Sequence, residues 1–232
     1  MLLIVQLGFS PTGHAQVPAS GVSRKAIKIK TPLLQKAFDS LDLKSGNPVF
    51  LRIFKESNEL EIWIKKDDTY SLFKNYTICY YSGSLGTKTR EGDCQAPEGF
   101  YSIYPKSLNP YSSYHLSINV GYPNAYDQLH GYTGNAIMIH GDCVSIGCYA
   151  MGDENIEEIW TILVKAFNNG QTSIPLHIFP FRMTNERLSL EMKNKWYPFW
   201  MNIKEGYELF EQIRKVPQVK IKNREYAFTP GR

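Results

Sequence analysis

A period of two in the apolar residues of the central chain is the feature that most constrains the fold. Apolar side chains alternate over 49–53, 60–64 and 72–80, and further apolar runs lie at 100–104, 114–120, 136–139 and 174–179. Successive side chains of a strand point to opposite faces, so this period predicts strands with one buried face. Clusters of glycine, proline, asparagine and aspartate separate the runs, as turns require. The sequence therefore predicts a mainly β, mostly antiparallel fold.

Helical patterns interrupt and flank these strand candidates. Asp153 is a predicted N-cap for a helix that ends at Asn169 and Gly170. Its apolar stripe consists of Ile156, Ile159, Trp160, Leu163, Val164 and Phe167. A shorter helix is predicted over 32–43, with Pro32 in its first turn, and helical spacing returns over 186–215. The chain then divides into a helical lead-in at 21–46, a β domain at 47–183 and a C-terminal helical extension at 184–232.

The first twenty residues are predicted to be an export segment. Residues 1–9, MLLIVQLGF, form a short apolar run, and Gly13, His14 and Ala15 have the small-x-small pattern of a signal cleavage site. This run is too short to span a bilayer. A buried N-terminal strand is the alternative interpretation. We expect an exported protein whose mature chain has no transmembrane segment.

Charged residues are spread along the chain rather than gathered. The net charge is +4, and lysines and arginines form no dense basic run. Nucleic-acid-binding proteins usually concentrate these residues in a patch or stripe. We therefore expect no nucleic-acid partner. A hydrophobic content of 43% with 21% charged residues is typical of a globular protein.

Residues 137–151, IMIHGDCVSIGCYAM, hold a histidine and two cysteines in one short stretch. Zinc is the first candidate, but His140, Cys143 and Cys148 supply only three ligands, and no second cysteine or histidine pair lies nearby. The fourth zinc ligand would have to be His115, His130 or His177, each of which lies in another part of the sequence. The sequence favours no metal site and predicts no cofactor.

The four cysteines of an exported chain can also form disulfides. Cys143 and Cys148 lie five positions apart on one tight segment, which does not favour a bridge between them. Cys79 and Cys94 lie near two adjacent strand candidates and are the favoured pair. Cys143 is then expected to be a packing residue or an occasional redox partner.

Nucleophilic catalysis is the third reading of the stretch. The strand candidate at 136–139 delivers His140 to the rim of a sheet, and Cys148 precedes the helix that begins near Asp153. Unpaired N–H groups at a helix start and a neighbouring imidazole both favour a thiolate, so we expect a lowered pKa for Cys148. The small residues around it leave room for N–H groups that face an oxyanion. From these residues alone, a nucleophile and buried, inert thiols are equal alternatives.

The stretch resembles the signature of the L,D-transpeptidase catalytic family, bacterial cell-wall enzymes with a His-Gly pair followed by Ser-x-Gly-Cys. The matching residues are His140, Gly141, Ser145, Gly147, Cys148, Tyr149 and Met151. A run ahead of the site at 92–103, and the segments 115–127, 174–183 and 199–212, also resemble that family or one branch of it. The resemblance covers residues 47–228 and implies a β sandwich of the L,D-transpeptidase type over 47–183.

The resemblance implies that Cys148 is the nucleophile and that His140 is the general base that takes its proton. The backbone N–H groups of Gly147 and Cys148 would form the oxyanion hole, with Gly141 and Ser145 in supporting positions. Two other residues are candidate substrate contacts. Tyr149 follows the nucleophile directly. 

Arg182 is the second candidate contact, because a guanidinium can bind a substrate carboxylate through two hydrogen bonds. Pairing of Arg182 with a glutamate or aspartate on the surface is an equal alternative.

The resemblance also implies a reaction and a compartment. The family forms an acyl-enzyme with a diaminopimelate carbonyl of a peptidoglycan stem peptide, in the periplasm, and passes the acyl group to a second amine. If water attacks instead, the enzyme is a hydrolase that releases protein or peptide, including peptidoglycan-linked lipoprotein. The branch that this chain resembles is associated with that reverse reaction. A non-catalytic wall-binding module with the same fold is a further alternative.

Three positions depart from the family pattern. Ser145 follows His140 by only five positions, where most members carry a long loop, and Ala150 stands where arginine or asparagine is common. Cys143 is an extra thiol near the same turn. A shorter loop leaves less cover over an acyl-enzyme, so we expect water to reach it more readily.

Overall fold

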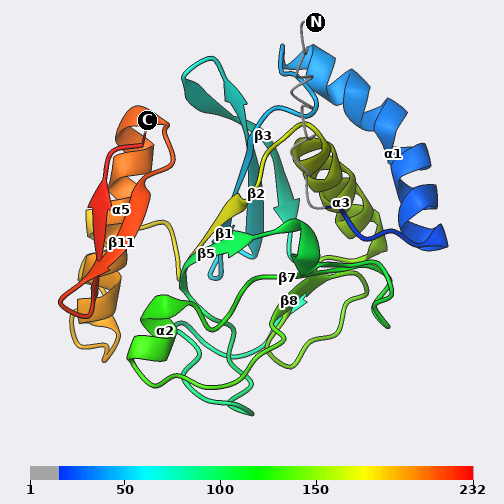
Figure 1. Ribbon diagram of the computed structural model, residues 1–232. Helices are drawn as coiled ribbons and strands as arrows, with labels where there is room; N and C mark the ends of the chain where they lie inside the picture. The colour runs from blue at the N-terminus through cyan, green and yellow to red at the C-terminus, as the bar shows by residue number, and fades with distance from the viewer. Residues whose placement is uncertain (1–15, 232) are drawn as a thin grey trace, which may run out of the picture.

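Two five-stranded sheets form the body of the protein (Figure 1), and the computed structural model describes residues 16–231. The first sheet has the order β3-β2-β1-β10-β5. Its strands are β1 (Val49–Phe54), β2 (Glu59–Lys66), β3 (Thr69–Thr77), β5 (Gly99–Ile103) and β10 (Ile174–Phe179). The predicted mainly β fold, with one helix after Cys148 and helical flanks, is confirmed.

The second sheet has much shorter strands in the order β4-β9-β8-β7-β6. They are β4 (Tyr80–Tyr81), β6 (Leu108–Asn109), β7 (Ser117–Asn119), β8 (Met138–His140) and β9 (Tyr149–Ala150). Two short helices accompany this half of the molecule, the 3-10 turn η1 (Pro105–Ser107) and α2 (Ala125–Leu129). Most strand pairs are antiparallel as predicted, whereas β1 with β10 and β8 with β9 are parallel.

The main core lies where the two sheets meet helix α3 (Asp153–Asn168). The predicted apolar stripe of α3 is buried along its whole length. The helix is capped by Gly152, one residue before the predicted Asp153. In β1, Leu51 and Ile53 face this core, and Phe50 and Phe54 face the opposite side of the sheet, as a period of two requires.

Helix α1 (Gly21–Ser40) packs against α3, and Figure 1 shows the two on the same side of the strands. The prediction of a helix over 32–43 is wrong at its start, because Pro32 lies inside α1. Ser20 and Ser23 form a capping box that begins the helix earlier. Lys30, buried on the face toward α3, pairs with Glu154 and lies 3.5 Å from Glu157, so tertiary contacts outweigh the missing N–H of the proline.

The C-terminal extension packs on the other side of the first sheet. It contains α4 (Asn185–Ser189), α5 (Tyr197–Ile213) and a hairpin of β11 (Gln218–Lys222) and β12 (Glu225–Thr229). The helices lie within the predicted 186–215 to within one residue, but the hairpin departs from the helical extension predicted for 184–232. Asn223 and Arg224 both have positive φ, as a two-residue hairpin turn requires. Their apolar neighbours pack with Trp200 and Phe179 into a second, aromatic-rich core.

Within residues 16–231, no helix is both long and apolar enough to cross a membrane. The predicted export segment at 1–20 lies mostly outside the described residues. Residues 16–20 belong to no helix or strand, and Ser20 is the N-cap of α1.

Candidate active site

The parallel pairing of β8 with β9 brings His140 and Cys148 to one face of the second sheet. Ile139 is opposite Tyr149, and His140 is opposite Ala150. Ile139 and Tyr149 are fully buried in the main core. Because side chains alternate along a strand, the residues on either side of that pair, His140 and Cys148 among them, face the other way.

A backbone contact fixes the position of the thiol. The N–H of Met138 donates to Sγ of Cys148 across 3.4 Å, and Sγ lies 3.8 Å from the carbonyl oxygen of Ala136. Both contacts come from the segment that leads into His140. The thiol is therefore held beside the strand that carries the imidazole.

The tautomer of His140 follows from its own hydrogen bond. Nδ1 lies 2.5 Å from the carbonyl oxygen of Gly141. A carbonyl oxygen only accepts, so Nδ1 must carry a proton. The other ring nitrogen, Nε2, is then the unprotonated one in the neutral ring. The Gly141 carbonyl is thus the group that orients His140, which the sequence does not reveal.

Burial keeps that ring neutral. His140 is only 2% exposed, and the ring of Tyr114 covers it at a centroid distance of 4.8 Å. Removal from water lowers the pKa of His140, although the bond to Gly141 and the charge of Asp142 act in the opposite direction. Near neutral pH the imidazole is therefore a proton acceptor.

The thiol does not have the lowered pKa expected from the sequence. Burial raises the pKa of Cys148, and the Met138 N–H and the charge of Lys88 only partly offset it. The expectation relied on the start of α3, but β9 and Gly152 separate Cys148 from that helix. The resting site therefore holds a protonated thiol and a neutral imidazole.

Glycines at 141 and 147 shape the turn between the two residues. A Cβ on Gly141 would lie 2.5 Å from Oδ1 of Asp153 and 2.9 Å from the carbonyl oxygen of Tyr114. Gly147 has φ near +140°, a conformation that side chains with a Cβ rarely adopt. A side chain larger than that of glycine would therefore clash at position 141, which gives a steric reason for the supporting role predicted for Gly141.

Ser145 closes the turn with two hydrogen bonds. Its hydroxyl donates to the carbonyl oxygen of Cys148 at 2.7 Å and accepts from the N–H of Gly147 at 3.1 Å. One of the two predicted oxyanion donors, the Gly147 N–H, is therefore bound to Ser145 in the resting structure. Side chains at the tip of the turn are exposed, with Ile146 at 85%.

A disulfide between Cys79 and Cys143 fastens this turn, and the predicted Cys79–Cys94 pair is wrong. Cys79 precedes β4, and its N–H donates to the carbonyl oxygen of Ala150, which brings it beside the turn. The Cα atoms of Cys79 and Cys143 are 5.5 Å apart. Cys94 is an exposed free thiol, and Cys148 is the other free cysteine.

The comparisons with known proteins agree with this geometry. The family model of the L,D-transpeptidase catalytic domain (YkuD) matches residues 59–176, which include both His140 and Cys148. The chain is 48% identical over 182 residues to the Escherichia coli K12 protein named "Putative L,D-transpeptidase YafK", covering 78% of this chain and 74% of that protein. The same match is found in Escherichia coli O157:H7.

The chain belongs to the L,D-transpeptidase family.

Solved structures give more distant likenesses. The helical cell shape determining protein Pgp2 from Campylobacter jejuni is 18% identical, with a TM-score of 0.47 over 84% of this chain and 80% of that one. Bd1075 from Bdellovibrio bacteriovorus is 19% identical, with a TM-score of 0.44 over 76% of this chain and 78% of that one.

The two predicted substrate contacts of this L,D-transpeptidase-family protein are both occupied by other interactions. Tyr149 is fully buried and its hydroxyl donates to the carbonyl oxygen of Pro97 at 2.8 Å, so its prediction as a substrate contact is wrong. Arg182 pairs with Glu59 and Glu61 at 2.8 and 2.9 Å. The structure thus shows the alternative predicted for Arg182, an ion pair with glutamates of the protein instead of a substrate carboxylate.

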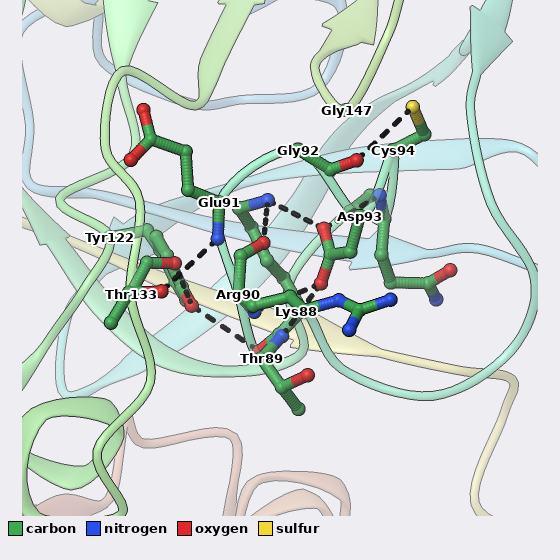
Figure 2. Close-up of polar contacts among 12 residues, drawn as sticks. Lys88, Thr89, Arg90, Glu91, Gly92, Asp93, Cys94, Tyr122, Thr133 and Gly147 are labelled. Atoms are coloured by element: carbon green, nitrogen blue, oxygen red, sulfur yellow. Dashed lines mark hydrogen bonds and ion pairs between the residues drawn. The ribbon is translucent and has the colours of Figure 1, made fainter.

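A loop at 88–95 borders the site (Figure 2), and no residue of this loop was predicted from the sequence to be a site residue. Lys88 is buried, and its ammonium donates to Asp93 at 2.6 Å and to the Arg90 carbonyl at 2.9 Å. Asp93 also accepts from the N–H groups of Thr89, Arg90 and Gln95. The loop ends at the site, since the carbonyl oxygen of Gln95 would lie 3.6 Å from a Cβ on Gly147.

Lys88 is a positive charge close enough to Cys148 to lower the pKa of the thiol. In the sequence it stands in a run of turn-forming residues, GTKTREGD. Such a run does not indicate whether its lysine is buried or exposed to solvent. The pattern TREGD signals only a turn closed by Asp93.

Of the other histidines within residues 16–231, none belongs to a cluster that could hold a metal ion. His115 contacts Glu157 at 2.9 Å, and His177 is buried among Phe50 and Phe100. Across residues 16–231, no group of three or more His, Cys, Asp or Glu side chains is arranged to hold a metal ion.

Proposed function

We propose that the protein is a cysteine acyl-transfer enzyme that acts on diaminopimelate-containing stem peptides of peptidoglycan. The observation that supports this most is the bond from His140 Nδ1 to the Gly141 carbonyl, which leaves Nε2 as a base on the face that carries the Cys148 thiol. Membership of the L,D-transpeptidase family supports the same pairing.

The first half-reaction follows from these groups. His140 Nε2 takes the thiol proton as Sγ of Cys148 attacks the diaminopimelate carbonyl carbon. The amide C–N bond then breaks, and the leaving amine receives that proton from the imidazolium. The product is a thioester between Cys148 and the stem. Attack by a second amine on the thioester carbonyl, with His140 again as the base, gives the crosslink and restores the thiol.

Three kinds of group can stabilise the charge that develops at this site during the reaction. The Cys148 N–H is the candidate oxyanion donor, joined by the Gly147 N–H when it leaves the Ser145 hydroxyl. Lys88 favours the thiolate, and the Gly141 carbonyl favours the imidazolium that forms beside it. Burial raises the strength of each of these interactions relative to water.

We infer that this chemistry takes place outside the cytoplasm, in the periplasm. The disulfide between Cys79 and Cys143 supports this compartment, because such bonds persist in oxidising environments. The apolar segment at residues 1–9 supports export.

Hydrolysis of a diaminopimelate-linked amide is the second candidate reaction. The observation that favours it is the short turn at 141–147, which the disulfide holds to Cys79 and which has no long loop above the thiol. Water that enters such a site attacks the thioester in place of the amine. A peptidoglycan-linked lipoprotein would then be released from its diaminopimelate.

Purified sacculi in heavy-oxygen water separate the two reactions. Transpeptidation predicts new 3→3 crosslinks without label, and hydrolysis predicts tripeptide stems whose freed diaminopimelate carboxylate carries one labelled oxygen. Labelling of Cys148 by a carbapenem distinguishes both from a non-catalytic wall-binding module. If sacculi are unchanged and Cys148 remains unlabelled, the enzymatic proposal is wrong.

A further inference from the structure

A polar cavity lies beside the active-site loop, between residues 84–95 and the segment that precedes α5. Its volume is about 520 Å³, and its walls include Thr89, Arg90, Lys195 and Trp196. The first two belong to the loop that reaches Gly147, and the other two to the C-terminal extension. The cavity is therefore formed jointly by the catalytic domain and the extension.

The walls of the cavity are firmly built. Gly86, with φ of +114°, lies against the Trp196 indole so closely that any Cβ there would overlap the ring. Beneath the loop, the fully buried Lys55 and Glu98 form an ion pair at 2.9 Å, and Glu98 also accepts from the indole N–H of Trp200 in α5. These contacts fix the extension to the loop.

Two cations at the cavity have no acidic partner. Within residues 16–231, neither Arg90 nor Lys195 forms a side-chain ion pair, although Lys195 lies 5.1 Å from the centre of the Trp196 ring. The carboxylate that lines the cavity, Asp93, is already satisfied by Lys88 and three backbone N–H groups. The cavity thus has a net positive charge and an aromatic wall.

A ligand that fits these walls carries a carboxylate and some apolar surface. A guanidinium and an ammonium bind carboxylates through charge-assisted hydrogen bonds, and the indole offers a flat apolar face. A four-residue stem extends over roughly 13–14 Å. Gln95 links the cavity to the site, because it lines the cavity and its carbonyl oxygen would lie 3.6 Å from a Cβ on Gly147, next to the thiol. A stem bound at Cys148 therefore has the length to extend toward the cavity.

We propose that this cavity binds a carboxylate of the stem peptide through Arg90 and Lys195. The inference rests on the proposed function and gives the C-terminal extension a role in substrate recognition. Because the two cations are placed by different parts of the chain, the site exists only when the extension is packed on the loop.

Binding to the full-length Cys148→Ala protein tests this without turnover. The probes are a synthetic diaminopimelate tetrapeptide with free carboxylates and the same peptide with every carboxylate converted to a carboxamide. By calorimetry, the free acid is expected to bind at least tenfold more tightly. Adding Arg90→Gln and Lys195→Gln should reduce that ratio to about twofold or less.

Lys193→Gln is the matched control, since Lys193 is an exposed cation two positions from Lys195 and does not line the cavity. It should leave the tenfold ratio intact. The inference is overturned if the double variant keeps the ratio, if the control lowers it equally, or if neither peptide binds. Turnover of sacculi by the wild type is a separate readout, so failure of the cavity and failure of the proposed reaction can be told apart.

Discussion

The two sheets of this protein are stabilised in different ways. In the first sheet the strands are long, and all six residues of β1 are buried. In the second sheet no strand exceeds three residues, and the chain is held by turns, by the Ser145 hydroxyl and by the Cys79–Cys143 disulfide. The sheet that carries the chemistry thus shares the main core but is also held by a few specific contacts, whereas the first sheet depends on distributed apolar burial.

Loss of the nucleophile should give the largest effect, and only on function. We expect Cys148→Ala to remove turnover of sacculi completely, because Cys143 is held in the disulfide and Cys94 lies on the separate loop at 88–95. Stability should change little, since the side chain is small and only partly buried. Muropeptide analysis and urea unfolding measure the two effects. Cys94→Ala is the control, and loss of turnover in it instead would reassign the nucleophile.

Breaking the disulfide should weaken the second sheet in both stability and function. The bond joins residues 64 positions apart, and such links typically contribute about 2–4 kcal/mol. We expect Cys79→Ser with Cys143→Ser to lose roughly this much in urea unfolding and also to alkylate Cys148 at a different rate, because the turn is released.

Leu51→Ala in the first sheet is the matched comparison. Its side chain is fully buried, so a loss of about 2–5 kcal/mol is expected. The rate of Cys148 alkylation should not change as long as the variant is folded. If both variants alter that rate equally, the two sheets are not independent in the way described.

Asp127, in α2 and hydrogen-bonded to Tyr101 of β5, should make the stability of the protein depend on pH, and this effect should be smaller. Burial raises its pKa from 3.8 to about 6, despite hydrogen bonds from the Asn124 N–H and the Tyr101 hydroxyl. A raised pKa in the folded state means that stability is full below pH 3.8 and declines as the pH rises through about 6. That shift corresponds to at most about 3 kcal/mol.

Asp127→Asn has no charge to bury, so its free energy of unfolding should not change with pH between about 3.8 and 6 on account of this residue. Urea unfolding between pH 4 and 7 would show a smaller change of unfolding free energy with pH in the variant than in the wild type. An equal slope in wild type and variant would assign the decline to another group.

Lys88→Met should give the smallest effect, a shift of Cys148 alkylation to higher pH. The cause is loss of a cation whose charge lowers the pKa of the thiol. Lys88→Arg should restore most of the original profile, which a purely structural role would not predict. Lys106→Met, an exposed cation on η1, should have no effect.

The same contrast explains what the sequence could predict. Periodicity located the long strands of the first sheet and the buried stripe of α3, because distributed burial leaves a repeating pattern. It missed β9, which has two residues, and the pairing of Cys79 with Cys143, which depends on how β4 meets β9. Such short elements carry no period.

The candidate site was predictable as far as its signature residues. The motif placed Cys148 and His140, but it could not show that the Gly141 carbonyl orients the ring or that Tyr149 faces the core. The helix-start argument failed because the thiol is separated from α3 by a strand. Lys88 and the Arg90–Lys195 cavity depend on tertiary packing that no local pattern encodes.

Alkylation of Cys148 as a function of pH, in a Cys94→Ser background, examines the His140–Cys148 pair itself. Between the pKa of His140 and that of the thiol, one proton is shared by the pair, so the fraction of thiolate–imidazolium form does not depend on pH. The wild type should therefore show a plateau in iodoacetamide rate over this interval. In His140→Ala the thiolate loses its proton acceptor, and the rate should fall about tenfold for each pH unit below the thiol pKa. Superimposable profiles would contradict the assignment of His140 as the base.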